Sequence, residues 1–252
     1  MTLPTHAGEP IHYGQLHGSS LSLALANTLQ QTKLSSLVIC TDTLAAQRIE
    51  NELAFFLGKD AQRILSFPDW ETLPYDAFSP HQDIISQRIA TLYKLLNQPG
   101  FILIVPVSSL MHYIATRHFI EQASFYLRIG DTMHIEHARQ QFEKQGYRCV
   151  NQVYEHGEFA VRGSIIDIFP MGSDGPYRID LFDDEVDSIR QFDPETQLSH
   201  DKIAAIDLLP ALEFPFDETG ISAFRQHWRD TFGGNPLQCP LYQNTSQGML
   251  SS

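Results

Sequence analysis

The sequence predicts an α/β fold built on a parallel sheet, followed by a smaller α+β module. The first half alternates apolar strands with amphipathic helices, which is typical of a parallel sheet covered by helices. After about residue 122 the pattern changes to short alternating strands, separated by turn residues such as HGE, PMGSDGP and DD. A helical pattern returns near residue 211. We therefore expect three segments: 1–121, 122–210 and 211–252.

In the first segment three strands are expected, and a helix is expected after each of the first two. Strands are predicted at 34–40 (LSSLVIC), 63–67 (RILSF) and 101–107 (FILIVPV). The last is continuously apolar, so it should be buried on both faces. Helices are predicted at 44–57 and 85–96, where apolar residues recur every three or four positions. Thr41 or Thr43 offers the N-cap of the first helix.

The later segments begin with a strand at 125–129 and a helix that ends at Gln145, before Gly146. An antiparallel meander is expected at 147–192. The spacing of Ile221, Phe224 and Trp228 predicts a further helix. The last stretch, GGNPLQCPLYQNTSQGMLSS, is expected to end without completing an element, as in a chain cut inside a further domain.

The composition favours protein partners over nucleic acid. The chain of 252 residues carries 17 basic and 30 acidic residues, a formal net charge of −13, and this excess of negative charge repels phosphate backbones. Its three cysteines are odd in number and far apart, which argues against a disulfide framework and for the reducing cytoplasm. No apolar run is long enough for a membrane span, and the first residues do not resemble a signal peptide.

The stretch LHGSSLSLALANTL places Gly18, Ser19 and Ser20 where an α/β protein often binds phosphate. A working phosphate loop reads GxxxxGK[ST], but the second glycine and the lysine are missing here, and the next lysine is Lys33. No DExx tetrad follows an apolar strand to hold Mg²⁺. We therefore expect no ATPase activity and no cofactor in this segment, and a helix N-terminus capped by Ser19 or Ser20.

The stretch PYRIDLFDDEVDSIRQF contains the strongest candidate for an interaction surface. Alternate residues of a strand share a face, so the core should receive Tyr177, Ile179 and Leu181. Arg178, Asp180 and Phe182 then lie on the other face. Arginine and aromatic residues are the commonest hot spots of protein interfaces.

A second arginine joins this candidate if the neighbouring strands pair. Arg162 precedes the apolar strand of SIIDIF and would lie at the same edge. The alternative is purely structural: Phe182 would cover a second core layer, and Arg178 would pair with Asp180 or Asp184. Alternation alone does not decide between these interpretations.

Other candidates have simpler explanations. FDDEVD has carboxylates spaced for a metal ion, although an acidic β-turn is the simpler interpretation. His134 and His137 do not form an HExxH motif and are expected to be exposed on a helix. Trp70 and Tyr75 could stack on a sugar or base, but packing over the end of the sheet is the default.

Four long stretches carry a resemblance to a known family. They are FPDWETLPYDAFSPHQDIISQRIATLYKLL (67–96), FILIVPVSSLM (101–111), EHGEFAVRGSIIDIFPMGSDGPYRIDLFDDEVDSIRQFD (155–193) and LLPALEFP (208–215). Together they resemble the N-terminal region of the bacterial transcription–repair coupling factors, the Mfd family.

The resemblance implies a degenerate RecA-like domain, similar to that of UvrB, which has lost nucleotide binding. This domain is interrupted by a module that docks the repair ATPase UvrA, through positions that correspond to Arg162, Arg178 and Phe182. No counterpart of the DNA-clamping β-hairpin of UvrB is found. The expected function is therefore an adaptor that recruits UvrA, and the alternative is a UvrB-like module that binds ATP or DNA.

The resemblance also implies functions that lie outside this segment. In the family, a later motor part uses ATP and Mg²⁺ to translocate on duplex DNA, and another domain binds RNA polymerase. The family's UvrA-binding surface is expected to be masked by a further domain until the motor engages.

Overall fold

The computed structural model describes residue 6 and residues 8–32, 34–72 and 79–249. Lys33 and Tyr75 lie outside the described residues. The chain divides into two compact units, one formed by residues 1–69 and 94–113 and the other by residues 70–93 and 114–252. The segments predicted from the sequence, 1–121, 122–210 and 211–252, are not the same divisions and stay a prediction.

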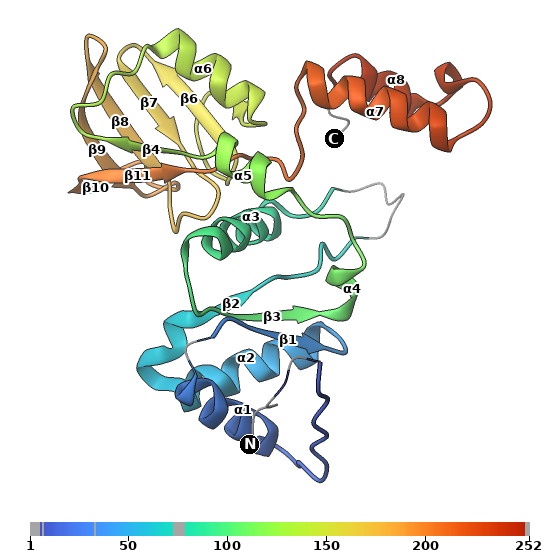
Figure 1. Ribbon diagram of the computed structural model, residues 1–252. Helices are drawn as coiled ribbons and strands as arrows, with labels where there is room; N and C mark the ends of the chain where they lie inside the picture. The colour runs from blue at the N-terminus through green and yellow to red at the C-terminus, as the bar shows by residue number, and fades with distance from the viewer. Residues whose placement is uncertain (1–5, 7, 33, 73–78, 250–252) are drawn as a thin grey trace. The chain divides into compact units, whose positions relative to one another are not determined.

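The first unit is built on a parallel sheet of three strands in the order β1-β3-β2 (Figure 1). The strands are β1 (Ser36–Cys40), β2 (Ile64–Ser66) and β3 (Ile102–Pro106). Ile104 and Val105 point to opposite faces of the central strand β3, and both are buried. The expected parallel sheet and the burial of this strand on both faces are thus observed.

Helices α1 (Ser20–Gln31) and α2 (Thr43–Leu57) pack against this sheet, with the short helices η1 (Gly58–Arg63) and α4 (Val107–Leu110) at its ends. The apolar stripe of α2 is buried as its spacing predicts. The predicted cap was wrong. Asp42 caps α2, because its Oδ1 accepts a hydrogen bond of 2.8 Å from the Ala45 N–H.

The second unit contains a sheet of six strands in the order β10-β9-β8-β7-β6-β5 (Figure 1). Their bounds are β5 (Arg148–Cys149), β6 (Glu158–Arg162), β7 (Ile165–Ile168), β8 (Tyr177–Phe182), β9 (Glu185–Phe192) and β10 (Ser199–Ile203). The strands from β6 to β10 pair antiparallel with their neighbours in chain order, so the predicted meander is confirmed.

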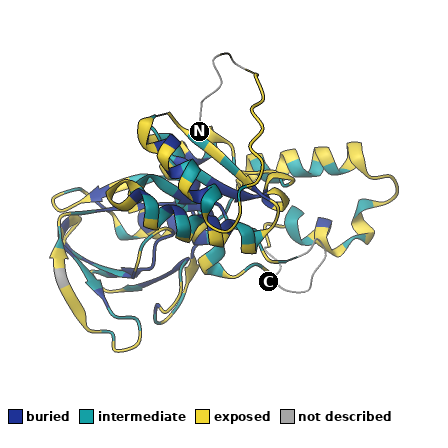
Figure 2. Ribbon diagram, turned by 90° about the horizontal axis from the view of Figure 1, so that it is seen from below, coloured by how far each residue is buried: buried dark blue, intermediate teal, exposed yellow. Residues whose placement is uncertain are grey.

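A second, two-stranded sheet pairs β4 (Phe125–Arg128) with β11 (Ala205–Leu208). One face of the meander packs on a core that also receives these strands, α6 (Ile135–Lys144) and the first part of α3 (Gln82–Asn97). Figure 2 shows this core as dark blue ribbon, with yellow turns at the edges. The predicted end of α6 is observed: Gly146 adopts φ +91°, and a Cβ there would collide with Leu212.

After α5 (Arg117–Ala123) and the meander, the chain ends in helix α7 (Glu218–Thr231), the turn η2 (Pro236–Gln238) and helix α8 (Pro240–Ser246). The expectation that the last stretch completes no element was therefore wrong, because η2 and α8 both end within it. The missed signals are Asn235, whose side chain caps η2, and a proline at the first position of each short helix. Within the described residues, no helix is long and apolar enough to cross a membrane.

Candidate protein-interaction surface

The candidate residues lie on the face of the meander that points away from the main core. Cross-strand register places Arg162 opposite Ile165, and Ile165 opposite Asp180. The next row places Asp167 opposite Arg178. Because directly opposed residues share a face, β6, β7 and β8 bring Arg162, Arg178 and Phe182 to one side of the sheet. Figure 1 shows these strands side by side.

Arg178 is held by an ion pair with a carboxylate on the neighbouring strand. Its Nε and Nη2 donate to the two carboxylate oxygens of Asp167, at 2.7 and 2.9 Å. Asp167 is 1% exposed and Arg178 is 20% exposed. Hydrogen bonding to Asp167 raises the pKa of Arg178 above its ordinary value. The predicted partners Asp180 and Asp184 were wrong, because residues opposed across a strand pair meet more closely than residues two apart on one strand.

Three further contacts fix the position of the Arg178 guanidinium. Its Cζ lies 4.8 Å from the centre of the Phe192 ring, which is a cation–π distance. Its Nη1 lies 3.4 Å from both the Gln197 carbonyl and the Ser199 hydroxyl. Arg178 is therefore held in place by contacts within the second unit, with 20% of its side chain exposed.

Arg162 is more accessible than Arg178. Its side chain is 47% exposed, and its Nη1 lies 3.8 Å from the same Asp167 carboxylate. Its Nη2 donates a 2.8 Å hydrogen bond to the Asn151 carbonyl. One buried carboxylate thus faces two arginines, and Asp180 on the same face places a second carboxylate near Arg178.

Phe182 ends β8 and is 74% exposed. The alternative that Phe182 covers a second core layer was therefore wrong. Its strand turns back at Asp183, a non-glycine residue with φ +54°, and Phe182 pairs with Glu185 across the turn. Exposed aromatic rings that share a surface with arginines are typical of interface hot spots.

Sequence reasoning missed Asp167, which organises this surface. The available signal was a carboxylate inside the apolar strand SIIDIF, because a charged residue in such a strand is normally paired. Its partner could not be named without the strand register.

The acidic stretch FDDEVD contains the turn between β8 and β9, as the simpler interpretation predicted. Nδ1 of His134 lies 3.0 Å from an Asp184 carboxylate oxygen, and the Met133 N–H donates to the Asp184 carbonyl. Among the described residues, no group of three or more histidine, cysteine or acidic side chains could hold a metal ion. His134, the N-cap of α6, is exposed as expected, and so is His137 on that helix.

The stretch around Gly18, Ser19 and Ser20, which was expected not to bind phosphate, contacts a carboxylate of the chain itself. Ser19 and Ser22, at the start of α1, donate hydrogen bonds of 3.0 and 2.5 Å to the two carboxylate oxygens of Glu52 on α2. Those hydrogen bonds lower the pKa of Glu52. The predicted side-chain cap was wrong: Ser19 is the N-cap residue but makes no capping hydrogen bond, and the Ser20 hydroxyl donates to the His17 carbonyl.

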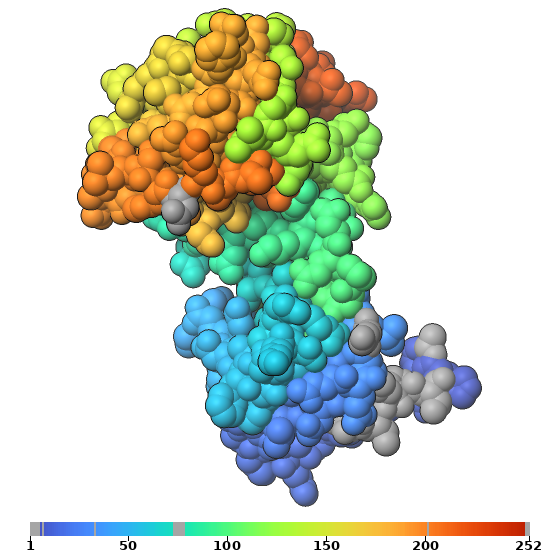
Figure 3. All heavy atoms as spheres, turned by 90° about the vertical axis from the view of Figure 1, so that its left-hand side faces the viewer, coloured from blue at the N-terminus to red at the C-terminus, as the bar shows by residue number. Residues whose placement is uncertain are grey.

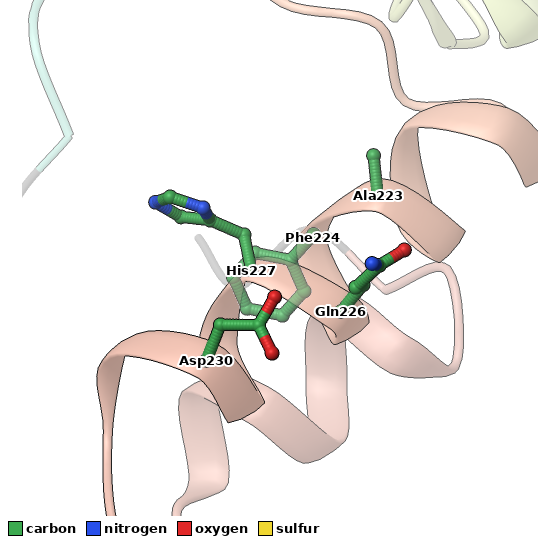
Figure 4. A pocket seen from close by; sticks show the side chains of 5 residues that line it. All are labelled: Ala223, Phe224, Gln226, His227 and Asp230. Atoms are coloured by element: carbon green, nitrogen blue, oxygen red, sulfur yellow. The ribbon is translucent and has the colours of Figure 1, made fainter.

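Trp70 in the aromatic loop and a hollow on α7 are two further features of the second unit. Nε1 of Trp70 donates to Glu213 at 3.1 Å, and the Arg88 guanidinium lies 4.5 Å from the centre of its ring, so Trp70 is packed internally. A hollow on α7, lined by Ala223, Phe224, Gln226, His227 and Asp230, has its side chains spread along one helix (Figure 4).

Comparisons with known proteins agree with this organisation. Residues 125–214 match the family described as the UvrB interaction domain. A transcription-repair-coupling factor of Escherichia coli is 43% identical over 249 residues, which cover 99% of this chain and 21% of that protein. This confirms the resemblance to the transcription-repair-coupling factors.

More distant relatives extend the match. The factor of Haemophilus influenzae is 42% identical over 99% of this chain and 22% of its own length. That of Staphylococcus aureus is 29% identical over 82% of this chain and 18% of its own length. The chain therefore spans about a fifth of the length of the curated coupling factors that it matches.

Proposed function

We propose that the second unit docks UvrA through Arg162, Arg178 and Phe182, so that the chain acts as an adaptor between transcription and excision repair. The observation that carries this proposal is the exposed ring of Phe182 on the same sheet face as the two arginines, within the region that matches a UvrB interaction domain. Phe182 would supply apolar burial. The arginines would pair with acidic groups of UvrA.

For the first unit we propose a scaffold role on a degenerate RecA-like fold. The support is Glu52, whose carboxylate already accepts the serine hydroxyls at the start of α1, where a bound phosphate would need donors. This observation disfavours the alternative of a UvrB-like ATP-binding module, and the net charge of −13 disfavours a DNA-binding one.

The functions of the longer coupling factors are proposals for this chain as well. We expect a cytoplasmic protein in which an ATP-dependent DNA translocase and an RNA polymerase contact are supplied by other parts. On this view the present segment supplies the contact to UvrA and hydrolyses no nucleotide.

The test is direct binding of the purified chain to UvrA. Phe182→Ala and Arg162→Ala change exposed side chains, so they should weaken binding without unfolding the chain. Loss of the buried phenyl contact is worth about 2 kcal/mol, or about 30-fold in affinity. Phe55→Ala is the matched control, because Phe55 is an exposed phenylalanine of the first unit.

The outcome that contradicts the proposal is unchanged UvrA binding by both variants. Arg178→Ala is a poorer probe, because it also removes the partner of a buried carboxylate. Its effect on binding must be interpreted together with its effect on stability.

A further inference from the structure

A row of basic residues crosses the same sheet face beyond the proposed contact. Register places Arg178 on β8 opposite Arg190 on β9, and Arg190 opposite Lys202 on β10. Directly opposed side chains share a face, with Cβ atoms about 4.5–5.5 Å apart. Arg178, Arg190 and Lys202 therefore form one continuous line, here called the basic row.

Two members of the basic row, Arg190 and Lys202, form no ion pair with an acidic side chain among the described residues. Like charges directly opposite each other destabilise a sheet. Asp167 neutralises the row at one end, where it pairs with Arg178. Nε of Arg190 is buried and has no hydrogen-bond partner among the described residues. Lys202 is exposed, and within the described part of the chain no acidic group pairs with it.

The row continues the surface proposed above. Arg178 belongs to both, and Arg162 and Phe182 lie on the same face. The strands β8 to β10 lie on the side of the second unit that Figure 3 turns toward the viewer. A partner that covers Phe182 and Arg178 is therefore adjacent to Arg190 and Lys202.

We propose that the basic row binds an acidic segment of the docking partner, with carboxylates placed against Arg190 and Lys202. This inference rests on the proposed function and deepens it: it extends the contact across β9 and β10 and gives the partner's chemistry. The end of the row held by Asp167 already shows how a carboxylate fits this face, because that side chain accepts two hydrogen bonds from one guanidinium.

Charge distribution favours a short acidic protein segment over nucleic acid. The turn beside Phe182 exposes Asp183, Asp184 and Glu185, and the chain carries a net charge of −13. A nucleic acid is charged along its whole length, so it would meet these carboxylates as well as the row. A local acidic segment can meet the row alone.

The experiment measures UvrA affinity of the full chain by biolayer interferometry at low and high salt. Arg190→Gln/Lys202→Gln should weaken binding about 10-fold or more, and the loss should shrink at high salt. Lys202→Arg keeps the charge and should bind as the wild type does. The matched control is Lys144→Gln, which removes one exposed lysine charge from α6 of the same unit and should leave the affinity unchanged.

Stability separates a binding role from a structural one. Removing one charge from a row of like charges should leave the melting temperature of Lys202→Gln unchanged or raised. A lowered melting temperature would overturn the inference, because it would show that Lys202 stabilises the free fold.

The remaining outcomes distinguish the two proposals. If the double variant binds UvrA like the wild type while Phe182→Ala does not, the basic row is overturned and the proposed function stands. If the wild-type chain does not bind UvrA at all, both are overturned. Salt-sensitive binding of duplex DNA that the double variant loses would overturn the assignment to carboxylates.

Discussion

The ion pair between Arg178 and Asp167 should stabilise the second unit strongly, and Arg178→Ala tests this. The substitution leaves a carboxylate that is 1% exposed without its bidentate partner. Breaking a buried pair in this way costs about 3–5 kcal/mol. Arg178 is partly exposed, and Arg162 stays 3.8 Å from the same carboxylate, so the lower end of about 3 kcal/mol applies.

This loss corresponds to a fall of about 6–12 °C in melting temperature for a unit of this size. Tryptophan fluorescence is a suitable probe, because both tryptophans, Trp70 and Trp228, belong to the second unit. Arg139→Ala is the control. It removes an exposed pair with Glu143 on one helix and should leave the melting temperature nearly unchanged.

A double-mutant cycle tests whether Arg178 and Asp167 stabilise the fold as a pair. Arg178→Met/Asp167→Leu replaces both charges by apolar groups and should recover most of the lost stability. If the two single substitutions instead add, with a coupling energy below about 1 kcal/mol, the pair does not act as a unit and the reasoning is wrong.

Three further predictions concern the backbone and the first unit. Gly146→Ala should destabilise the second unit by about 2–4 kcal/mol in urea melts, because φ is +91° and the new Cβ meets Leu212. Asp183→Gly should stabilise it by ~0.5 kcal/mol, because glycine adopts φ +54° without strain; a destabilised variant would contradict this. Folding lowers the pKa of Glu52, so the ionised carboxylate stabilises the folded chain. This contribution is fully present at pH values above the carboxyl pKa of the unfolded chain, and it is lost as the pH falls through the lower pKa of the folded chain. Faster amide exchange in α1 at acid pH should report this loss, and Glu52→Gln should remove the pH dependence.

The spacing of apolar residues predicted most helices and strands, because the periodicity of each element decides which of its side chains are buried. Alternation assigned Ile179 and Leu181 to the core, and the three- and four-residue spacing of α2 was sufficient to locate that helix. The cap of α2 was assigned to Thr41 or Thr43, and Asp42 between them was overlooked, because which of the three caps the helix depends on the backbone geometry where the helix begins.

Contacts between residues far apart in the chain could not be predicted from the sequence. The pairing of Arg178 with Asp167 depends on the register of β7 against β8, and that of Ser22 with Glu52 on how α1 and α2 pack. The candidate residues themselves could be selected from residue type and alternation. Their electrostatics could not, because the charges that matter are brought together by tertiary structure.

The carboxylate at the start of α1 would hinder the design of a nucleotide site there. A glycine and a lysine introduced near Gly18 would supply two groups of a phosphate loop, but Glu52 would still occupy the hydroxyls of Ser19 and Ser22 and repel an incoming phosphate. Such a design would therefore require coordinated changes on two helices, α1 and α2.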